Sequence, residues 1–228
     1  MNAPSLLQQW FPNITDWTEI GQACIDTLLM LGGSLLLTVV IGLPLGVWLF
    51  LASRDQLHDS PRSYAALSLV VNVLRSIPFI ILMILLMPLT FFLMRATIGI
   101  RGAIPPLVIG AAPFFARLVE SSLREVGAGV VEASQAMGAT TGQIVRRVLL
   151  PEARAGIVAA ITVTAIALVG YTAMGGIIGA GGLGSLAYQY GYLGYKPDYM
   201  LVTVALLVLL VQLLQMLGDA IVQRMSHR

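Results

Sequence analysis

Few side chains in this sequence could carry out chemistry, and they are not grouped. Cys24 is the single cysteine, so it can form neither an intrachain disulfide nor a thiolate metal cluster. The two histidines, His58 and His227, lie far apart in the chain, and no His-Cys grouping offers the usual ligands of structural zinc. The sequence therefore predicts no catalytic residues and no metal site.

A glycine-rich stretch and the lone lysine are the features that could bind a nucleotide. Gly179, Gly181 and Gly184 match the spacing of a dinucleotide-binding loop, but they follow a long apolar run where the motif requires a strand of a βαβ unit. Lys196 is followed by Pro197, so it cannot complete the Gly-Lys-Ser/Thr of a phosphate-binding loop. We therefore interpret the glycines as an outer turn between two apolar helices.

The composition is that of a membrane protein. Of the 228 residues, 57% are hydrophobic and 11% are charged, and the mean hydropathy is +0.87. Soluble domains carry about 25% charged residues, so a soluble globular domain is excluded. The net charge is +2 and the basic residues are spread along the chain, which argues against a nucleic-acid surface. We expect an all-α polytopic protein in a lipid bilayer, with residues 1–228 forming one transmembrane domain.

Five apolar runs reach the length of about 20 residues that a transmembrane helix needs. The second contains Pro78 and Pro88, which a span tolerates where its neighbours satisfy the freed carbonyl groups. The third is the weakest, because three prolines and two charges interrupt it. The expected spans are residues 20–51, 64–93, 103–123, 155–178 and 199–222, and the polar segment 124–154 lies between the third and fourth.

Orientation follows from the basic residues, because short loops rich in Lys and Arg stay cytoplasmic. Five spans with the N-terminus outside leave the C-terminus and segment 124–154 in the cytoplasm. Three basic residues are then outside, and a four-span topology without the third span gives a similar bias, so charge alone leaves both topologies open. The eight basic residues expected to be cytoplasmic are Arg54, Arg62, Arg124, Arg146, Arg147, Arg154, Arg224 and Arg228.

The polar segment 124–154 predicts two short helices that meet at a turn. Gly138 suits the left-handed conformation that ends many helices. Thr140 and Gln143 have the spacing of a capping box, which starts the next helix. Pro151 then marks the entry into the fourth span. An amphipathic elbow of this kind is typical of a surface that docks a partner.

The elbow residues keep a characteristic spacing: Glu132, Ala133, Ser134, Gly138, Ala139, Leu150 and Pro151. This pattern resembles the coupling motif of ABC importer permeases, with conservative departures at Ser134 and at Val148. Other parts of the chain resemble the methionine-type branch of that family. They are residues 72–79, 110–117, 168–176, 181–184 and 188–192.

The resemblance implies a function and a set of partners. It implies a bacterial inner-membrane permease that forms a homodimer around the translocation path and imports an amino acid, methionine in its D or L form. The elbows would dock two ATPase subunits, which would bind ATP and Mg²⁺, so this chain would be no enzyme and would bind no cofactor. A periplasmic or lipid-anchored binding protein would deliver the substrate.

Five further residues are singled out within the spans. The resemblance implies that Met174, near the outer end of the fourth span, helps to close the path, and Tyr171 lies one turn earlier. Arg75, Arg117 and Glu120 are expected to face protein or water, since a charge at the bilayer centre costs about 2.5–3.5 kcal/mol. Glu120 can pair with an arginine on either side along one helix face.

Three alternatives stay open from the sequence. The chain could be an importer permease for another small solute, a secondary transporter without an ATPase, or a membrane scaffold. A secondary transporter would need ion-coupling residues at mid-span or inverted repeats, and neither is evident. A DNA-binding elbow is disfavoured because only Arg146 and Arg147 would face phosphates.

Overall fold

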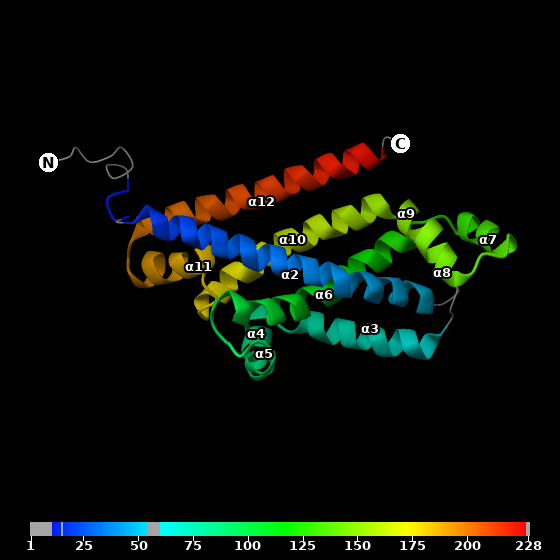
Figure 1. Ribbon diagram of the computed structural model, residues 1–228, viewed down its shortest axis with the longest axis horizontal. Helices are drawn as coiled ribbons and strands as arrows, with labels where there is room; N and C mark the ends of the chain where they lie inside the picture. Colours follow the sequence, from blue (N-terminus) through cyan, green and yellow to red (C-terminus); the bar gives the residue numbers. More distant parts are fainter. Residues whose placement is uncertain (1–10, 15, 54–59, 227–228) are drawn as a thin grey trace. The chain divides into compact units, whose positions relative to one another are not determined.

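The computed structural model describes residues 11–14, 16–53 and 60–226, and the regular elements in these ranges are all helical (Figure 1). The predicted all-α fold is confirmed. Arg54, His58, His227 and Arg228, which the sequence analysis used, lie outside the described residues. The elements are α2 (Trp17–Ala52), α3 (Pro61–Ser76), α4 (Phe79–Leu85), α5 (Met87–Met94), α6 (Gly99–Arg124), α7 (Ala128–Ala136), α8 (Thr141–Ile144), η1 (Val145–Leu149), α9 (Leu150–Glu152), α10 (Arg154–Ile177), α11 (Gly182–Leu186), η2 (Ala187–Leu193) and α12 (Pro197–Ser226).

The chain forms two compact units, each assembled from three separate stretches. Unit 1 comprises Met1–Ser34, Pro78–Leu107 and Ile166–Leu213, and unit 2 comprises Leu35–Ile77, Val108–Ala165 and Leu214–Arg228. The four longest helices, α2, α6, α10 and α12, each contribute residues to both units. Each unit is described below by itself.

Four of the described helices are long and apolar enough to cross a membrane: α2, α6, α10 and the Pro197–Met225 part of α12. A fifth is added if the bent pair α3 and α4 counts as one span. The segment that was weakest by sequence is the continuous helix α6, in which 67% of the apolar window is buried. Its prolines at 105, 106 and 113 are buried too, so packing within protein accommodates them.

The segment predicted as one span over residues 64–93 consists of three helices. Ile77 has an extended backbone (φ −79°, ψ 124°), because the residue before a proline is pushed away from helical angles. Pro78 therefore stands before α4 as its cap. A second break at Leu86 precedes α5, where Pro88 lies in the first turn and its missing N–H breaks no helical bond. Both prolines mark the start of a helix, which their position within an apolar run did not reveal.

Two glycines bring α2 and α6 together in unit 2. A Cβ atom at Gly46 would lie 2.6 Å from the Ala116 carbonyl oxygen and 2.6 Å from Val119 Cβ. A Cβ atom at Gly42 would lie 2.8 Å from the Phe115 ring. Side chains larger than hydrogen would therefore separate the helices, as at other small-residue contacts between membrane helices.

A glycine turn connects α10 to α11 in unit 1. Gly179, Gly181 and Gly182 have φ of +88°, +86° and +75°, which side chains other than glycine adopt with difficulty. The Leu183 backbone N–H then donates to Thr27 Oγ1 at 2.9 Å, which attaches the turn to α2. The stretch is a helix-to-helix turn, as the sequence indicated.

The contact between α2 and α6 can be tested with a matched pair of alanine variants. Gly32→Ala places its methyl in open space and gains about 1 kcal/mol of helix propensity. Gly46→Ala gains the same propensity but collides with backbone, and overpacking of this kind costs about 1–3 kcal/mol. Thermal unfolding of the purified protein in detergent should give a lower Tm for Gly46→Ala than for Gly32→Ala. Equal values would show that the helices are not held at backbone contact.

Candidate functional site

The turn of the elbow is built by local hydrogen bonds. Gly138 has φ +80°, and its N–H donates to the Gln135 carbonyl at 2.9 Å, which ends α7. Thr140 N–H donates to Gln143 Oε1 at 2.9 Å, and Thr140 Oγ1 accepts from Gln143 N–H at 3.4 Å. This is the predicted capping box, and it starts α8.

The second arm of the elbow contains a π-helical turn that the sequence did not predict. Over Val145–Leu149 the helix widens, and the Leu150 N–H donates to the Val145 carbonyl five residues earlier. Pro151 follows at once and has no N–H to donate. The widened turn therefore lies directly before the proline that would interrupt a regular α-helix. A short helix, α9, then leads to α10.

The inner side of the elbow is anchored in the core of unit 2. Ile144 and Leu149 are 1% and 0% exposed and belong to one cluster with Val119 and Leu123 of α6. Ala153, at the end of α9, is buried in the same cluster. Figure 1 shows α7 and α8 close together at the end of α6. The elbow is thus packed onto the helices that precede and follow it.

The outer side of the elbow is exposed. Glu132 and Ala133 on α7 are exposed, and Met137 at its end is 80% exposed. Val130, one turn before Ala133, is also exposed. An apolar stripe thus lies open on a helix that is fixed from behind, and such stripes mark interaction sites.

The remaining motif residues divide between the two sides. Ser134 is buried and donates its hydroxyl to the Val130 carbonyl at 2.8 Å, so it faces inward. Gly138 and Pro151 are exposed, and Ala139 and Leu150 are half-buried against the core. Met137 was not singled out as a site residue. Its signal in the sequence was the spacing of Val130, Ala133 and Met137, which also fits a buried helix face.

The two proposed path residues lie one turn apart on α10, in unit 1. Met174 is 45% exposed, so its own unit does not cover it. Tyr171 is half-buried, and its ring stacks on Phe79 with centroids 4.3 Å apart and planes 7° apart. Phe79, the first residue of α4, is a site neighbour that the sequence did not suggest.

The three charged residues that were expected to face protein or water lie in unit 2 and have partners. Glu120 is 3% exposed and accepts from Arg117 and from Arg124, each at 2.7 Å. Arg75 is exposed and lies over the Phe114 ring, 5.7 Å from its centroid. The expectation that Glu120 pairs with an arginine on either side is confirmed.

An aromatic cluster holds the start of α12 in unit 1. Lys196 Nζ lies 5.3 Å from the Tyr190 ring centroid and 5.6 Å from that of Tyr199, a cation–π arrangement. The two rings stack 4.8 Å apart. A hydrogen bond to the Glu19 carboxylate raises the pKa of Tyr190 above its usual value.

Long apolar helices, paired charges within them and an elbow that is packed on its inner side and open on its outer side define a polytopic membrane protein. The chain belongs to the family of binding-protein-dependent transport system inner membrane components, whose model matches residues 39–227. It is therefore a multi-pass inner-membrane permease, a transport protein.

Two similar sequences and one similar structure belong to proteins named for methionine transport. The chain is 45% identical to the probable D-methionine transport system permease MetI of Vibrio cholerae, over 97% of this chain and 98% of that protein. It is 46% identical to the methionine import system permease MetP of Bacillus subtilis, over 98% and 100%. It superposes on a chain of the inward-facing MetNI methionine ABC transporter with a TM-score of 0.89 and 47% identity, covering 97% and 99% of the two chains.

The left-handed turn of the elbow predicts which substitutions of Gly138 are tolerated better than others. Left-handed angles cost most residues about 1–2 kcal/mol, and asparagine less, so Gly138→Asn should keep more activity than Gly138→Val. No atom lies within 4 Å of a Cβ at this position, so any loss reflects backbone strain. The loss of activity is measured as solute uptake by membrane vesicles, corrected for the amount of inserted protein.

Gly142→Val is the matched control, because Gly142 also has open space around it but lies in α8 with helical angles. It should transport better than Gly138→Val. Equal transport by the two valine variants would mean that the left-handed turn is not required for coupling.

Proposed function

We propose that this chain is the permease subunit of an ATP-driven methionine importer. Two copies form the translocation path, and each docks an ATPase subunit through its elbow. ATP and Mg²⁺ bind to the ATPase subunits, and this chain binds no cofactor. The N-terminus is outside and the elbow is cytoplasmic, in agreement with the excess of arginines on that side.

The observation that carries the proposal is the two-sided elbow. Its inner side is fixed to α6 by buried Ile144 and Leu149, and its outer side presents Ala133 and Met137. A rigid arm of this kind passes a displacement of its docked partner to the spans, whereas a mobile loop would absorb it. The match to a chain of the MetNI transporter supports an ATPase as the partner.

Methionine as substrate is supported by the relatives in Vibrio cholerae and Bacillus subtilis, each named for methionine transport. Delivery by a periplasmic or lipid-anchored binding protein is supported by the family, which is described as binding-protein-dependent. Another small solute is the alternative substrate, and the uptake assay below separates the two.

At the outer end of α10 we assign the closure of the path to Met174. Its flexible thioether is left uncovered by its own unit, and such a side chain can plug a narrow passage and then move aside. Tyr171 is engaged with Phe79 and holds the start of α4 against this region.

The proposed function is tested by reconstituting the permease with its ATPase and binding protein in proteoliposomes. Radiolabelled L- and D-methionine should accumulate only with ATP, and unlabelled methionine should compete more strongly than leucine or histidine. ATP-dependent uptake of another solute would support the importer class and replace the substrate. No uptake of methionine or of any competitor would contradict the proposal.

The docking surface is tested at Met137 with two substitutions. Met137→Leu keeps an apolar side chain of similar volume and should retain the ATPase during purification. Met137→Asp places a charge in the docked interface and should release the ATPase and abolish uptake, while membrane insertion stays normal because the residue is 80% exposed. Retention of the ATPase by both variants would place the docking surface elsewhere.

The gate is tested by shortening Met174. Met174→Ala should raise the ATP-independent leak of methionine from loaded proteoliposomes, because the plug is removed, and should leave ATP hydrolysis unchanged. Ile177→Ala is the control, since Ile177 has similar exposure and lies one turn further along α10. The same leak in both variants would argue against a specific role of Met174.

A further inference from the structure

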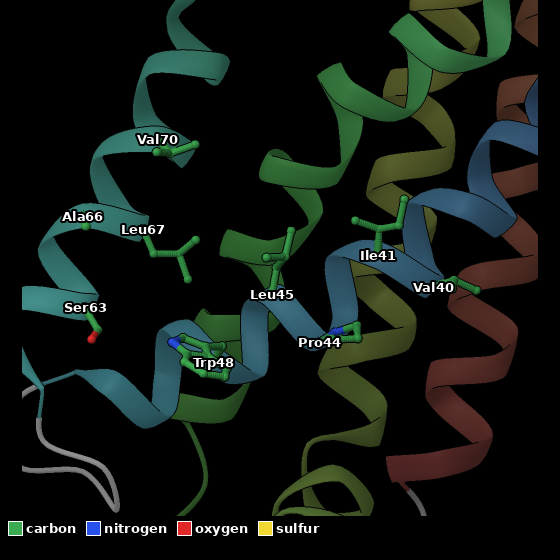
Figure 2. Close-up of a pocket in the computed structure, with 9 residues that line it drawn as sticks. All are labelled: Val40, Ile41, Pro44, Leu45, Trp48, Ser63, Ala66, Leu67 and Val70. Carbon is green, nitrogen blue, oxygen red and sulfur yellow. The ribbon is translucent and has the colours of Figure 1, made fainter. Parts of the chain in front are cut away.

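Helix α3 is held in unit 2 by a small apolar cluster, in which Val71 packs with Leu49 of α2 and Ala116 of α6, and by a set of polar contacts with α6. Val71 is its one buried side chain, although the helix has 16 residues. On one side an apolar groove of about 630 Å³ runs between α3 and α2, lined by residues such as Leu67 and Val70 of α3 and Trp48 of α2. Figure 2 shows these side chains along the open groove. Because this apolar contact is small, the polar contacts of α3 with α6 form a substantial part of its attachment.

Arg117 of α6 makes most of the hydrogen bonds between α3 and α6. Its guanidinium donates to the Tyr64 hydroxyl at 3.4 Å, to the Asn72 side-chain oxygen at 3.1 Å, and to both the hydroxyl and the carbonyl of Ser68. These three residues are spaced by four along α3, so they form one stripe on a single face. One side chain thus holds two turns of α3.

The carboxylate of Glu120 fixes the guanidinium in this position. Glu120 accepts from Arg117 at 2.7 Å and from the Tyr64 hydroxyl at 3.2 Å. Arg124 donates to the same carboxylate at 2.7 Å. A nearly buried carboxylate with two arginine partners is satisfied in charge and in hydrogen bonds, which gives the cluster a fixed geometry.

The cluster is connected through the chain to the elbow at the end of α6 and to Phe79 at the end of α3. Arg124 is the last residue of α6, and α7 of the elbow begins at Ala128. At its other end α3 leads through Ile77 and Pro78 into Phe79, whose ring stacks on Tyr171. Tyr171 lies one turn before Met174. A displacement of the elbow that moves the end of α6 will move α3 with it as long as Arg117 holds the two helices together.

We infer that Arg117 is a positioning residue for transport, which passes the movement of the elbow to α3 and from there to the aromatic pair beside the path. The inference rests on the proposed function, in which the ATPase moves the elbow. It assigns to Arg117 a role in coupling that is separate from the stability of the fold.

The test compares four substitutions in the complete importer complex. Arg117→Met removes the guanidinium and all its hydrogen bonds. Asn72→Ala removes one partner of Arg117 on α3 and leaves its pair with Glu120 intact. Arg117→Lys keeps the charge but not the planar fork that reaches several partners. Arg124→Gln is the control, because it removes a partner of Glu120 but leaves the hydrogen bonds of Arg117 to Ser68 and Asn72 of α3 in place.

ATP hydrolysis and methionine uptake are measured on each complex. Arg117→Met should hydrolyse ATP at close to the wild-type rate and lower the uptake per ATP roughly tenfold, a typical coupling between sites. Asn72→Ala and Arg117→Lys should be intermediate, and Arg124→Gln should match the wild type. If Arg117→Met does not fold, Arg117→Met with Glu120→Gln leaves no charge of this pair unpaired and should show the same loss of coupling.

A spin label on exposed Ile81 of α4, with Cys24 replaced by alanine, gives a readout that needs no substrate. The distance between the two labels of the dimer should change with nucleotide in the wild type and not in Arg117→Met. A nucleotide-dependent change in the label distance of the wild type without methionine uptake would contradict methionine as the substrate. It would leave the proposed role of Arg117 in place. Wild-type uptake per ATP in Arg117→Met, or an equal loss of uptake, ATP hydrolysis and Tm in all four variants, would overturn the inference.

Discussion

The close approach of α2 and α6 is the contact on which unit 2 depends. In a bilayer, apolar side chains gain little by leaving lipid for another apolar surface, so helices associate where their backbones can come close. Gly42 and Gly46 allow this along two turns of α2. As a result α6 is tightly packed against its neighbours, with Phe115 and Val119 fully buried, and the elbow can pack against it. Without that support Ile144 and Leu149 would have no core to enter.

Local features of the chain were predictable because their causes are local. The left-handed Gly138 and the capping box of Thr140 and Gln143 depend on residues within four positions of each other. The apolar runs of α2, α10 and α12 are long enough to be recognised without any neighbour. Pairing of Glu120 with arginines also follows from spacing on one helix. These features included most of the motif that defines the docking elbow.

What escaped prediction depends on contacts between distant residues. Whether Pro78 bends a span or starts a helix is decided by its surroundings, and the same holds for the π-helical turn before Pro151. The exposure of Met137 could not be read from a helical spacing that a buried face shares. The stack of Phe79 on Tyr171 joins residues 92 positions apart, and the partners of Arg117 on α3 are about 50 positions away. The available signal for the contact with Arg117 was the polar residue at every fourth position from Tyr64. Because the surrounding residues are apolar, this stripe was not recognised.

The exposed surface of α12 supports the proposal that two copies of the chain work together. Only 6% of its apolar window is buried, compared with 67% for α6, although both are candidate spans. Thr203 and Gly218 are buried on the inward face of α12, whereas Leu201, Val208 and Leu217 are among its exposed residues. This broad apolar surface is available to lipid or to a second chain. In the proposed dimer, a second copy of the chain would cover part of this surface and would bring a second uncovered Met174 into the same assembly, so that the proposed gate would be formed by two thioethers.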